Sequence, residues 1–107
     1  MNWTEILRRC YDLERVLYTG HARREMREEQ FGPVSDQEVW EAIRNGEVIE
    51  EYPEDTPYPS VLISGATGSG RPIHIVCAYS SGEDMTFIIT AYQPDPTRWI
   101  DYRRRKR

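Results

Sequence analysis

The spacing of the apolar residues changes near residue 47, and this change constrains the fold more than any other feature of the chain. Before that point apolar residues recur every three or four positions, which is the repeat of amphipathic helices. After it the period becomes two and the residues are β-branched or aromatic, as in half-buried strands. Helices that precede a run of strands are typical of an α+β domain. We therefore expect a helical part over about 3–46, a sheet over about 47–99 and a basic tail at 100–107.

Three helices are expected in the first part. The apolar stripe of residues 3–17 predicts the first helix, and residues 21–30 predict the second, closed by Phe-Gly-Pro. Ser35 and Glu38 have the spacing of a capping box, in which a hydroxyl and a carboxylate satisfy free amides at a helix start. Gly46 is expected to end that third helix in a left-handed conformation.

Four strands are expected, at 47–52, 60–64, 73–79 and 85–92. Short turns between consecutive strands imply an antiparallel meander, so we expect N-terminal helices packed on one four-stranded antiparallel sheet. If residues 80–84 form a five-residue hairpin loop, His74 lies opposite Thr90, with Tyr92 two residues further along the same polar face. The core face of the last strand then consists of Phe87, Ile89 and Ala91.

Length and charge limit the classes of protein. A chain of 107 residues suits one domain with a single modest core. Its net charge of −4 argues against a general polyanion binder, but the charges are unevenly distributed. Ten acidic residues and one arginine lie within 28–59, whereas six basic residues and one aspartate lie within 98–107. The chain therefore has an acidic segment and a basic tail.

The cysteines and the hydropathy indicate an intracellular chain without a cofactor. Cys10 and Cys77 lie far apart and follow no secretory signal, so we expect two buried, reduced thiols in a cytoplasmic protein. No apolar run approaches the roughly 18 residues of a membrane span. The two cysteines and two histidines include no short ligand pair, and neither a metal nor another cofactor is expected.

Both histidines lie in compact polar segments, a pattern that suits acid–base chemistry on a phosphodiester. One imidazole, with an ordinary pKa near 6.5, can take the ribose 2′-hydroxyl proton while another protonates the leaving 5′-oxygen. Arginines and a helix N-terminus favour the anionic phosphate. The expected catalytic residues are His21, His74, Arg71, Thr90 and Tyr92, and the expected phosphate-binding residues are Arg24 and Arg71.

The same residues also have structural interpretations. A histidine inside an apolar strand, such as His74, is more often a satisfied structural residue than a catalyst, and one at a helix start is commonly a cap. Thr90 and Tyr92 are good strand formers. Arginines beside glutamates form surface ion pairs of little energy. Trp99 is expected to cover an edge of the core, and a basic terminus is most often solvated and mobile.

Several segments together resemble one prokaryotic family. The chain from about Thr19 to Trp99 is similar to the domain-of-unknown-function family numbered four-two-five-eight. The segments that carry the resemblance are His21-Ala22 with Met26, Val34-Ser35, the helix from Trp40 to Gly46, the strand from Gly70 to Val76, and the run from Ile89 to Trp99. Each segment is weak alone, and the combination is specific.

The resemblance implies a likeness to small RelE-like and barnase-like toxin ribonucleases of toxin–antitoxin systems. It also implies an antitoxin-like partner with a small zinc finger, by analogy between families. The arginines that such proteins carry near two positions of the second helix are replaced here by Glu25 and Glu29. Glutamates at these positions imply weaker affinity for phosphate.

Two hypotheses follow. In the first, the chain is a metal-independent endoribonuclease that cleaves messenger RNA by 2′-hydroxyl attack, leaving a cyclic phosphate. The residues expected to contact the RNA backbone are Arg98, Arg103, Arg104 and Arg105. In the second, it is a non-catalytic protein-binding module whose acidic face, within residues 28–55, docks a basic partner. A positive cleft around His74 favours the first, and an acidic surface with both histidines buried favours the second.

Overall fold

The computed structural model describes residues 1–106. Its elements are α1 (Trp3–Asp12), β1 (Val16–Tyr18), α2 (Gly20–Arg27), α3 (Asp36–Asn45), β2 (Glu47–Tyr52), β3 (Ser60–Ala66), β4 (Pro72–Ser80), β5 (Met85–Tyr92), β6 (Trp99–Ile100) and β7 (Arg104–Arg105).

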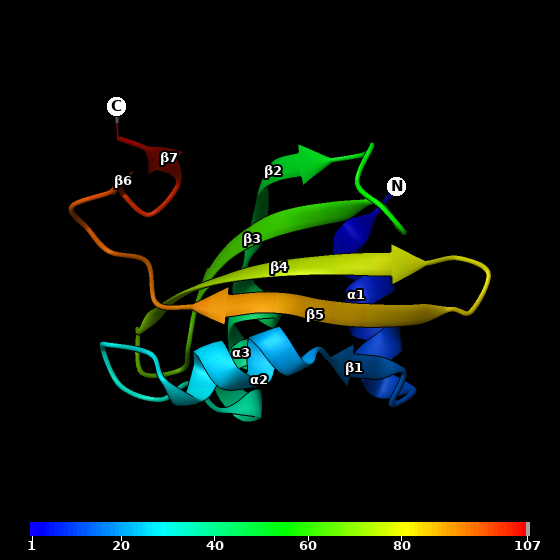
Figure 1. Cartoon of the computed structure of the whole chain (residues 1–107), viewed down its shortest axis with the longest axis horizontal. Coiled ribbons are helices and arrows are strands. Elements are labelled where there is room, and N and C mark those ends of the chain that lie inside the picture. The colour runs from blue at the N-terminus through cyan, green and yellow to red at the C-terminus, as the bar shows by residue number, and fades with distance from the viewer. Residues whose placement is uncertain (107) are drawn as a thin grey trace.

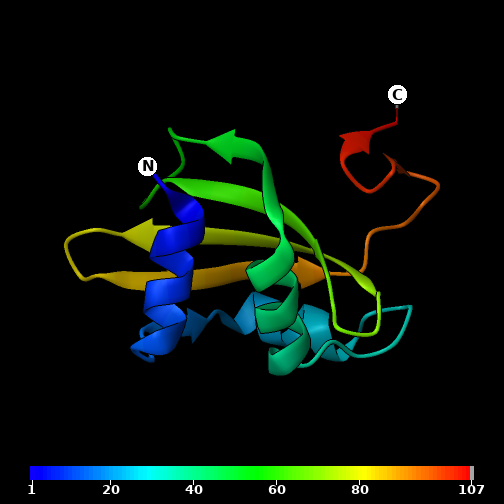
Figure 2. The same cartoon turned by 180° about the vertical axis from the view of Figure 1, so that it is seen from behind.

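Five strands form one mixed sheet in the order β1-β5-β4-β3-β2. β1 runs parallel to β5, and every other neighbouring pair is antiparallel. Figure 2 shows α1 and α3 in front of the sheet, and α2 packs against β5 (Figure 1). The predicted α+β class is confirmed. The predicted four-stranded antiparallel sheet is wrong, because a fifth strand joins the sheet in parallel.

The fifth strand lies within the segment that the sequence assigned to the first helix. α1 ends at Asp12 instead of residue 17, and Glu14 has a positive φ of 56° that turns the chain. β1 then pairs with β5. Leu13 and Leu17 continue the helical spacing of α1, but both side chains are exposed, so they do not belong to a buried helical stripe.

α2 spans Gly20–Arg27 instead of the predicted 21–30, and Thr19 is its N-cap. At α3 the predicted capping box of Ser35 and Glu38 is confirmed. The predicted left-handed Gly46 is wrong, since its φ is −91° and its ψ 175°, an extended backbone. Glycine is needed there for space, because a Cβ atom would lie 2.6 Å from the Ala42 carbonyl oxygen.

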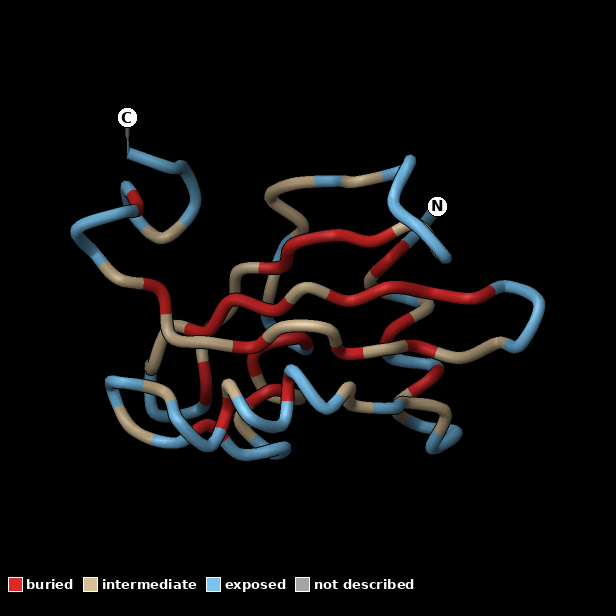
Figure 3. Tube along the Cα trace, in the orientation of Figure 1, coloured by how far each residue is buried: buried red, intermediate tan, exposed pale blue. Residues whose placement is uncertain are grey.

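The core lies between the helices and one face of the sheet, where the central strands are buried along most of their length (Figure 3). α3 lies very close to β3, because a Cβ atom on Gly65 would meet the Ala42 carbonyl oxygen at 1.9 Å. Cys10 and Cys77 are buried in this core and unpaired, as expected. None of the described helices has the length and apolar character of a membrane span.

Two β-bulges decide which residues share the outer face of the sheet, the face away from α1 and α3. Ile49 in β2 and Ile89 in β5 are the extra residues at the two shifts of register. The bulges align two rows of side chains across β2, β3, β4 and β5. The first row is Glu47, Ser64, His74 and Tyr92, and the second is Glu50, Leu62, Val76 and Thr90.

The predicted register of the last hairpin is therefore wrong in detail. His74 pairs with Tyr92 and not with Thr90, and Ser80 pairs with Met85, which shortens the loop to residues 81–84. The bulge also changes the core face, which consists of Thr86, Ile88 and Ala91. The prediction that His74, Thr90 and Tyr92 share one face is confirmed.

Side chains replace the missing strand where β1 stops. Beyond Tyr18 the edge of β5 has no strand partner within residues 1–106, and the Thr19 hydroxyl donates to the Ile89 carbonyl at 3.3 Å. The Ala91 N–H donates to Glu25 Oε1 at 2.8 Å, and the Gln93 N–H donates to Glu29 Oε2 at 3.3 Å. Glu25 of α2 and Glu29, just after it, thus accept from backbone N–H groups at the end of β5.

The basic tail is a folded hairpin. β6 pairs with β7, and the Lys106 N–H donates to the Arg98 carbonyl at 2.8 Å. We call residues 99–106 the C-terminal strap. The strap follows the end of β5 and lies near β2 (Figure 1), where it packs over His74. Residues 100, 101 and 103–106 are exposed, as expected for a basic tail, but the tail also makes contacts with the outer face of the sheet that the sequence did not predict. Residue 107 of the predicted tail lies outside the described residues.

Candidate functional site

His74 lies fully buried in the first outer-face row, with both ring nitrogens hydrogen-bonded. Its Nε2 lies 2.6 Å from the Tyr102 carbonyl oxygen of the strap, and its Nδ1 lies 3.2 Å from the Tyr92 hydroxyl. A carbonyl can only accept, so we assign the ring proton to Nε2, and Nδ1 then accepts from Tyr92. Burial lowers the pKa of His74, which favours this neutral tautomer.

The Trp99 ring covers the His74 ring, and the Arg105 guanidinium in turn covers Trp99. The Trp99 ring meets the His74 ring edge-on with 4.4 Å between centroids, and the Arg105 guanidinium lies 4.7 Å from the Trp99 centroid. Arg105 also donates to both carboxylate oxygens of Glu50, at 3.0 and 3.2 Å. This bidentate contact lowers the pKa of the Glu50 carboxyl group. Trp99 is buried, but it covers His74 on the outer face of the sheet and is not part of the helix–sheet core cluster.

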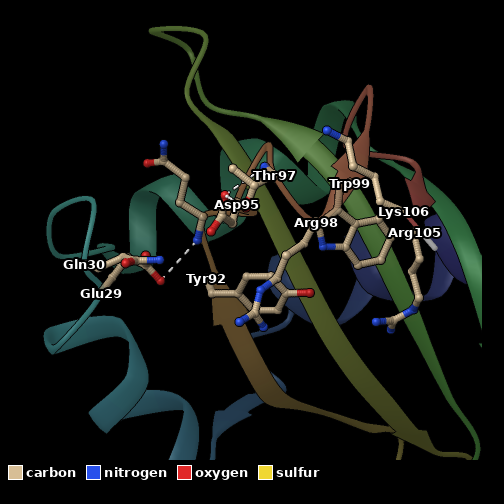
Figure 4. A pocket seen from close by; sticks show the side chains of 10 residues that line it. Glu29, Gln30, Tyr92, Asp95, Thr97, Arg98, Trp99, Arg105 and Lys106 are labelled. Carbon is tan, nitrogen blue, oxygen red and sulfur yellow. Dashed lines mark hydrogen bonds between the residues drawn. The ribbon is translucent and has the colours of Figure 1, made fainter.

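A polar hollow of about 690 Å³ opens beside this cluster, between the end of β5, the 28–30 segment and the strap (Figure 4). Its walls carry three cationic side chains, two carboxylates and the edge of a phenol ring, namely Arg98, Arg105, Lys106, Glu29, Asp95 and Tyr92. Cations outnumber carboxylates there. Burial raises the pKa of Tyr92 to about 12, so its hydroxyl stays protonated near neutral pH.

His21 and Arg24 lie elsewhere. They line a separate hollow of about 340 Å³ on the exposed side of α2, and the His21 side chain is 63% exposed. The His21 Nε2 atom lies 3.9 Å from Glu25 Oε2, the ion-pair spacing of one helical turn. Glu29 lines both hollows, but the two histidines do not line a common one. The structure therefore does not join two imidazoles at one phosphate site.

Arg71 is occupied by internal contacts. Its Nε donates to Gln93 Oε1 at 2.7 Å, and one terminal nitrogen donates to the Pro33 carbonyl at 2.9 Å and to Glu38 Oε2 at 3.1 Å. The other terminal nitrogen donates to the Gly32 carbonyl. Arg71 thus joins the α2–α3 connection to the end of β5, and it does not line the hollow beside Tyr92.

The remaining predicted residues are divided between the strap and the second row. Thr90 is half-buried beside Val76 and does not line the hollow. Arg98 lines the hollow, Arg103 pairs with Glu47, and Arg104 is exposed on β7.

Sequence reasoning assigned no role at this site to Ser64, Glu47 or Glu50. Ser64 lies on the outer face because side chains alternate along β3. Glu47 and Glu50 share that face because of the bulge at Ile49, which the hydrophobic pattern does not reveal. Within residues 1–106, no group of three or more metal-ligating side chains is found. Burial raises the pKa of the Cys77 thiol to about 12, so it is a poor source of thiolate.

These features define an α+β domain whose outer sheet face bears a buried histidine–tyrosine pair beneath a basic C-terminal hairpin. The family described as "Domain of unknown function (DUF4258)" matches residues 18–93, and the chain belongs to that family. The match begins at Tyr18, the last residue of β1, includes α2 to β5 and ends before the strap. No curated protein and no solved structure gave a significant match.

Proposed function

We propose that the protein is a toxin-like, metal-independent endoribonuclease of the RelE-like kind, with its active site in the hollow at the end of β5. One observation carries the proposal. The Tyr92 hydroxyl is hydrogen-bonded to a neutral, oriented His74 at the edge of a hollow that also holds Arg98, Arg105 and Lys106. A proton acceptor behind a hydroxyl, next to cations that attract phosphate, suits cleavage of RNA by its own 2′-hydroxyl.

The proposed step uses Tyr92 as the group that touches RNA and His74 as its proton acceptor. The 2′-hydroxyl gives its proton to Tyr92 Oη while Tyr92 passes its own proton to His74 Nδ1. The 2′-oxygen bonds to phosphorus and the P–O5′ bond breaks, giving a 2′,3′-cyclic phosphate and a 5′-oxygen that takes a proton from water. The high pKa of Tyr92 suits a relay that never forms a free phenolate.

The cations of the hollow would hold the scissile phosphate and the adjoining RNA backbone. Arg98 is exposed, and Arg105 and Lys106 reach the same hollow from the strap. Contacts of this kind release counterions, so binding should weaken steeply as salt increases. Glu29 and Asp95 reduce the local positive charge, which would favour a short RNA segment over a long polyanion.

This proposal changes the roles expected from the sequence. His21 and Arg24 line a different hollow, and Arg71 is held by carbonyl, amide and carboxylate oxygens. None of the three is given a catalytic role. The proposal keeps His74 and Tyr92, with His74 acting through the tyrosine.

Tyr92→Phe tests the proposal because it removes only the hydroxyl. We expect the purified wild-type chain to cleave a labelled RNA in the presence of EDTA and to leave cyclic-phosphate ends. Tyr92→Phe should be slower by about 100-fold or more, the usual contribution of a proton-transfer group. Tyr58→Phe is the matched control, since Tyr58 is hydrogen-bonded to Glu83 at the β4–β5 loop.

Expression in a bacterium supplies the second readout. Induction of the wild type should stop growth and fragment RNA, and induction of Tyr92→Phe should do neither. Equal cleavage by the two proteins would reject the relay. A folded wild type that leaves RNA intact, both purified and in cells with ribosomes, would reject the ribonuclease itself.

A further inference from the structure

The strap lies on the outer face of the sheet in the way a bound peptide would. It does not add a strand to the sheet, because β6 and β7 pair only with each other among the described residues. Its central contact is the Tyr102 carbonyl, which accepts from Ser64 Oγ at 2.9 Å and from His74 Nε2 at 2.6 Å. The donors on the sheet therefore bind a main-chain carbonyl, a group that any peptide carries.

Charge fixes the strap on either side of this carbonyl. Arg103 pairs with Glu47, and Arg105 pairs with Glu50. The bulge at Ile49 places these two glutamates on the same face, three residues apart, so that they meet arginines two residues apart. Across its two outer-face rows the sheet thus has two carboxylates, a pair of donors and a contact surface for an indole ring, a combination that is specific for an arginine-bearing segment with an aromatic residue.

The contacts that hold the strap are open to competition. The side chains of Arg103 and Glu47 are 61% and 53% exposed, and solvent-exposed ion pairs contribute little and are weakened by salt. Glu54, which follows β2, forms no ion pair within residues 1–106. A segment with more positive charge than the strap would therefore gain contacts that the strap does not make.

We propose that the outer face from β2 to β4 is a docking groove for an extended, arginine-bearing segment of a partner protein, and that the strap is its resident occupant. The partner segment carries two arginines two residues apart for Glu47 and Glu50, and an aromatic side chain for the place of Trp99. Binding displaces the strap. The proposal rests on charge complementarity and on the strap's own contacts, and it does not depend on ribonuclease activity.

The test uses the full chain and a synthetic peptide with the sequence of residues 97–107 as the probe. In the protein, the double substitution Arg103→Ala and Arg105→Ala removes both ion pairs of the strap and leaves Glu47 and Glu50 without those partners. This variant should bind the labelled peptide at least about tenfold more tightly than the wild type, because a tethered strap competes at an effective concentration near millimolar. Fluorescence anisotropy measures the affinity, and circular dichroism checks that the variant is folded.

Two controls establish where the peptide binds and why. Adding Glu47→Gln and Glu50→Gln to the loosened protein should lower its affinity for the peptide about tenfold or more, because two charge-assisted contacts are lost. A peptide with the same composition in scrambled order should bind no better than that four-substitution protein. Hydrogen exchange should show protection at residues 47–50 and 62–76 when the native-sequence peptide binds.

Three results would overturn the proposal. The first is equal binding by the native and scrambled peptides, which would reduce the groove to general charge attraction. The second is binding that ignores Glu47→Gln and Glu50→Gln. The third is a concentration-dependent dimer of the wild type in sedimentation experiments, with cross-links between the strap of one copy and β2 of the other, which would make a second copy of this chain the occupant.

Discussion

Trp99→Ala should detach the strap without unfolding the domain. Trp99 is 5% exposed and is the one buried residue of the strap, and loss of a buried tryptophan side chain typically costs about 3–5 kcal/mol. The other anchors are the Tyr102 carbonyl and exposed ion pairs, each worth about 1 kcal/mol or less. The strap lies outside the helix–sheet core, so the substitution should lower the free energy of local opening of the strap and leave the free energy of global unfolding nearly unchanged.

Hydrogen exchange read by mass spectrometry separates local from global effects. The strap amides, including that of Lys106, should exchange at least about 100-fold faster in Trp99→Ala, since each 1.4 kcal/mol is a factor of ten. Peptides from 72–80 should keep the protection they have in the wild type. Trp40→Ala is the matched control, because Trp40 packs against Tyr11 on the helical side, and its loss should lower global stability without selective release of the strap. Equal loss of protection in 72–80 and in the strap would refute a separately hinged strap.

Three other perturbations test other parts of the structure. Gly65→Ala should destabilise by more than about 3 kcal/mol in urea unfolding, because α3 leaves no room, whereas Gly82→Ala, with no atom within 4 Å, should be neutral. Glu25→Ala should cost about 1–3 kcal/mol by leaving the Ala91 N–H unpaired, and Glu25→Gln, which keeps an acceptor, should restore most of it. Because burial lowers the pKa of His74, its neutral ring stabilises the fold above pH 6.5, and that contribution falls as pH drops below 6.5. Strap exchange, corrected for intrinsic rates, should rise in acid, and a pH-independent strap would contradict this reasoning.

The sequence predicts those elements whose signals are local. The capping box at Ser35 fixes the start of α3, and alternation fixes β5 at 85–92, because each depends on neighbours only a few residues away. β1 escapes prediction for the opposite reason. Its three residues form a strand only because β5 supplies partners about 70 positions later, and Leu17 continues the spacing of the preceding helix. A short parallel edge strand has no local signal strong enough to compete with that pattern.

The sequence predicts only part of the candidate site, because several of its contacts join residues that lie far apart in the chain. Side chains alternate along β5, so Thr90 and Tyr92 lie on one face, and the predicted pairing puts His74 on that face too. In the structure the partner of His74 shifts by two residues, from Thr90 to Tyr92, and a shift of two residues leaves the face unchanged. The strap over His74 could not be predicted, because Arg103 and Arg105 look like a solvated terminus until Glu47 and Glu50 are brought opposite them. That meeting depends on the bulge at Ile49, which composition and period do not show.

One hydrogen-bond arrangement links the strap to the chemistry proposed for Tyr92. The Tyr102 carbonyl accepts a hydrogen bond from the Nε2–H of His74, and this leaves Nδ1 as the acceptor that faces the Tyr92 hydroxyl. The tautomer that seats the strap is therefore also the one that can receive a proton from Tyr92. A partner segment that replaces the strap and presents its own carbonyl at the same point would preserve that tautomer, whereas a strap that opens without replacement would free the ring to change tautomer or to titrate. The proposed docking at the groove and the proposed proton transfer at Tyr92 would thus be coupled through one imidazole, that of His74 on β4.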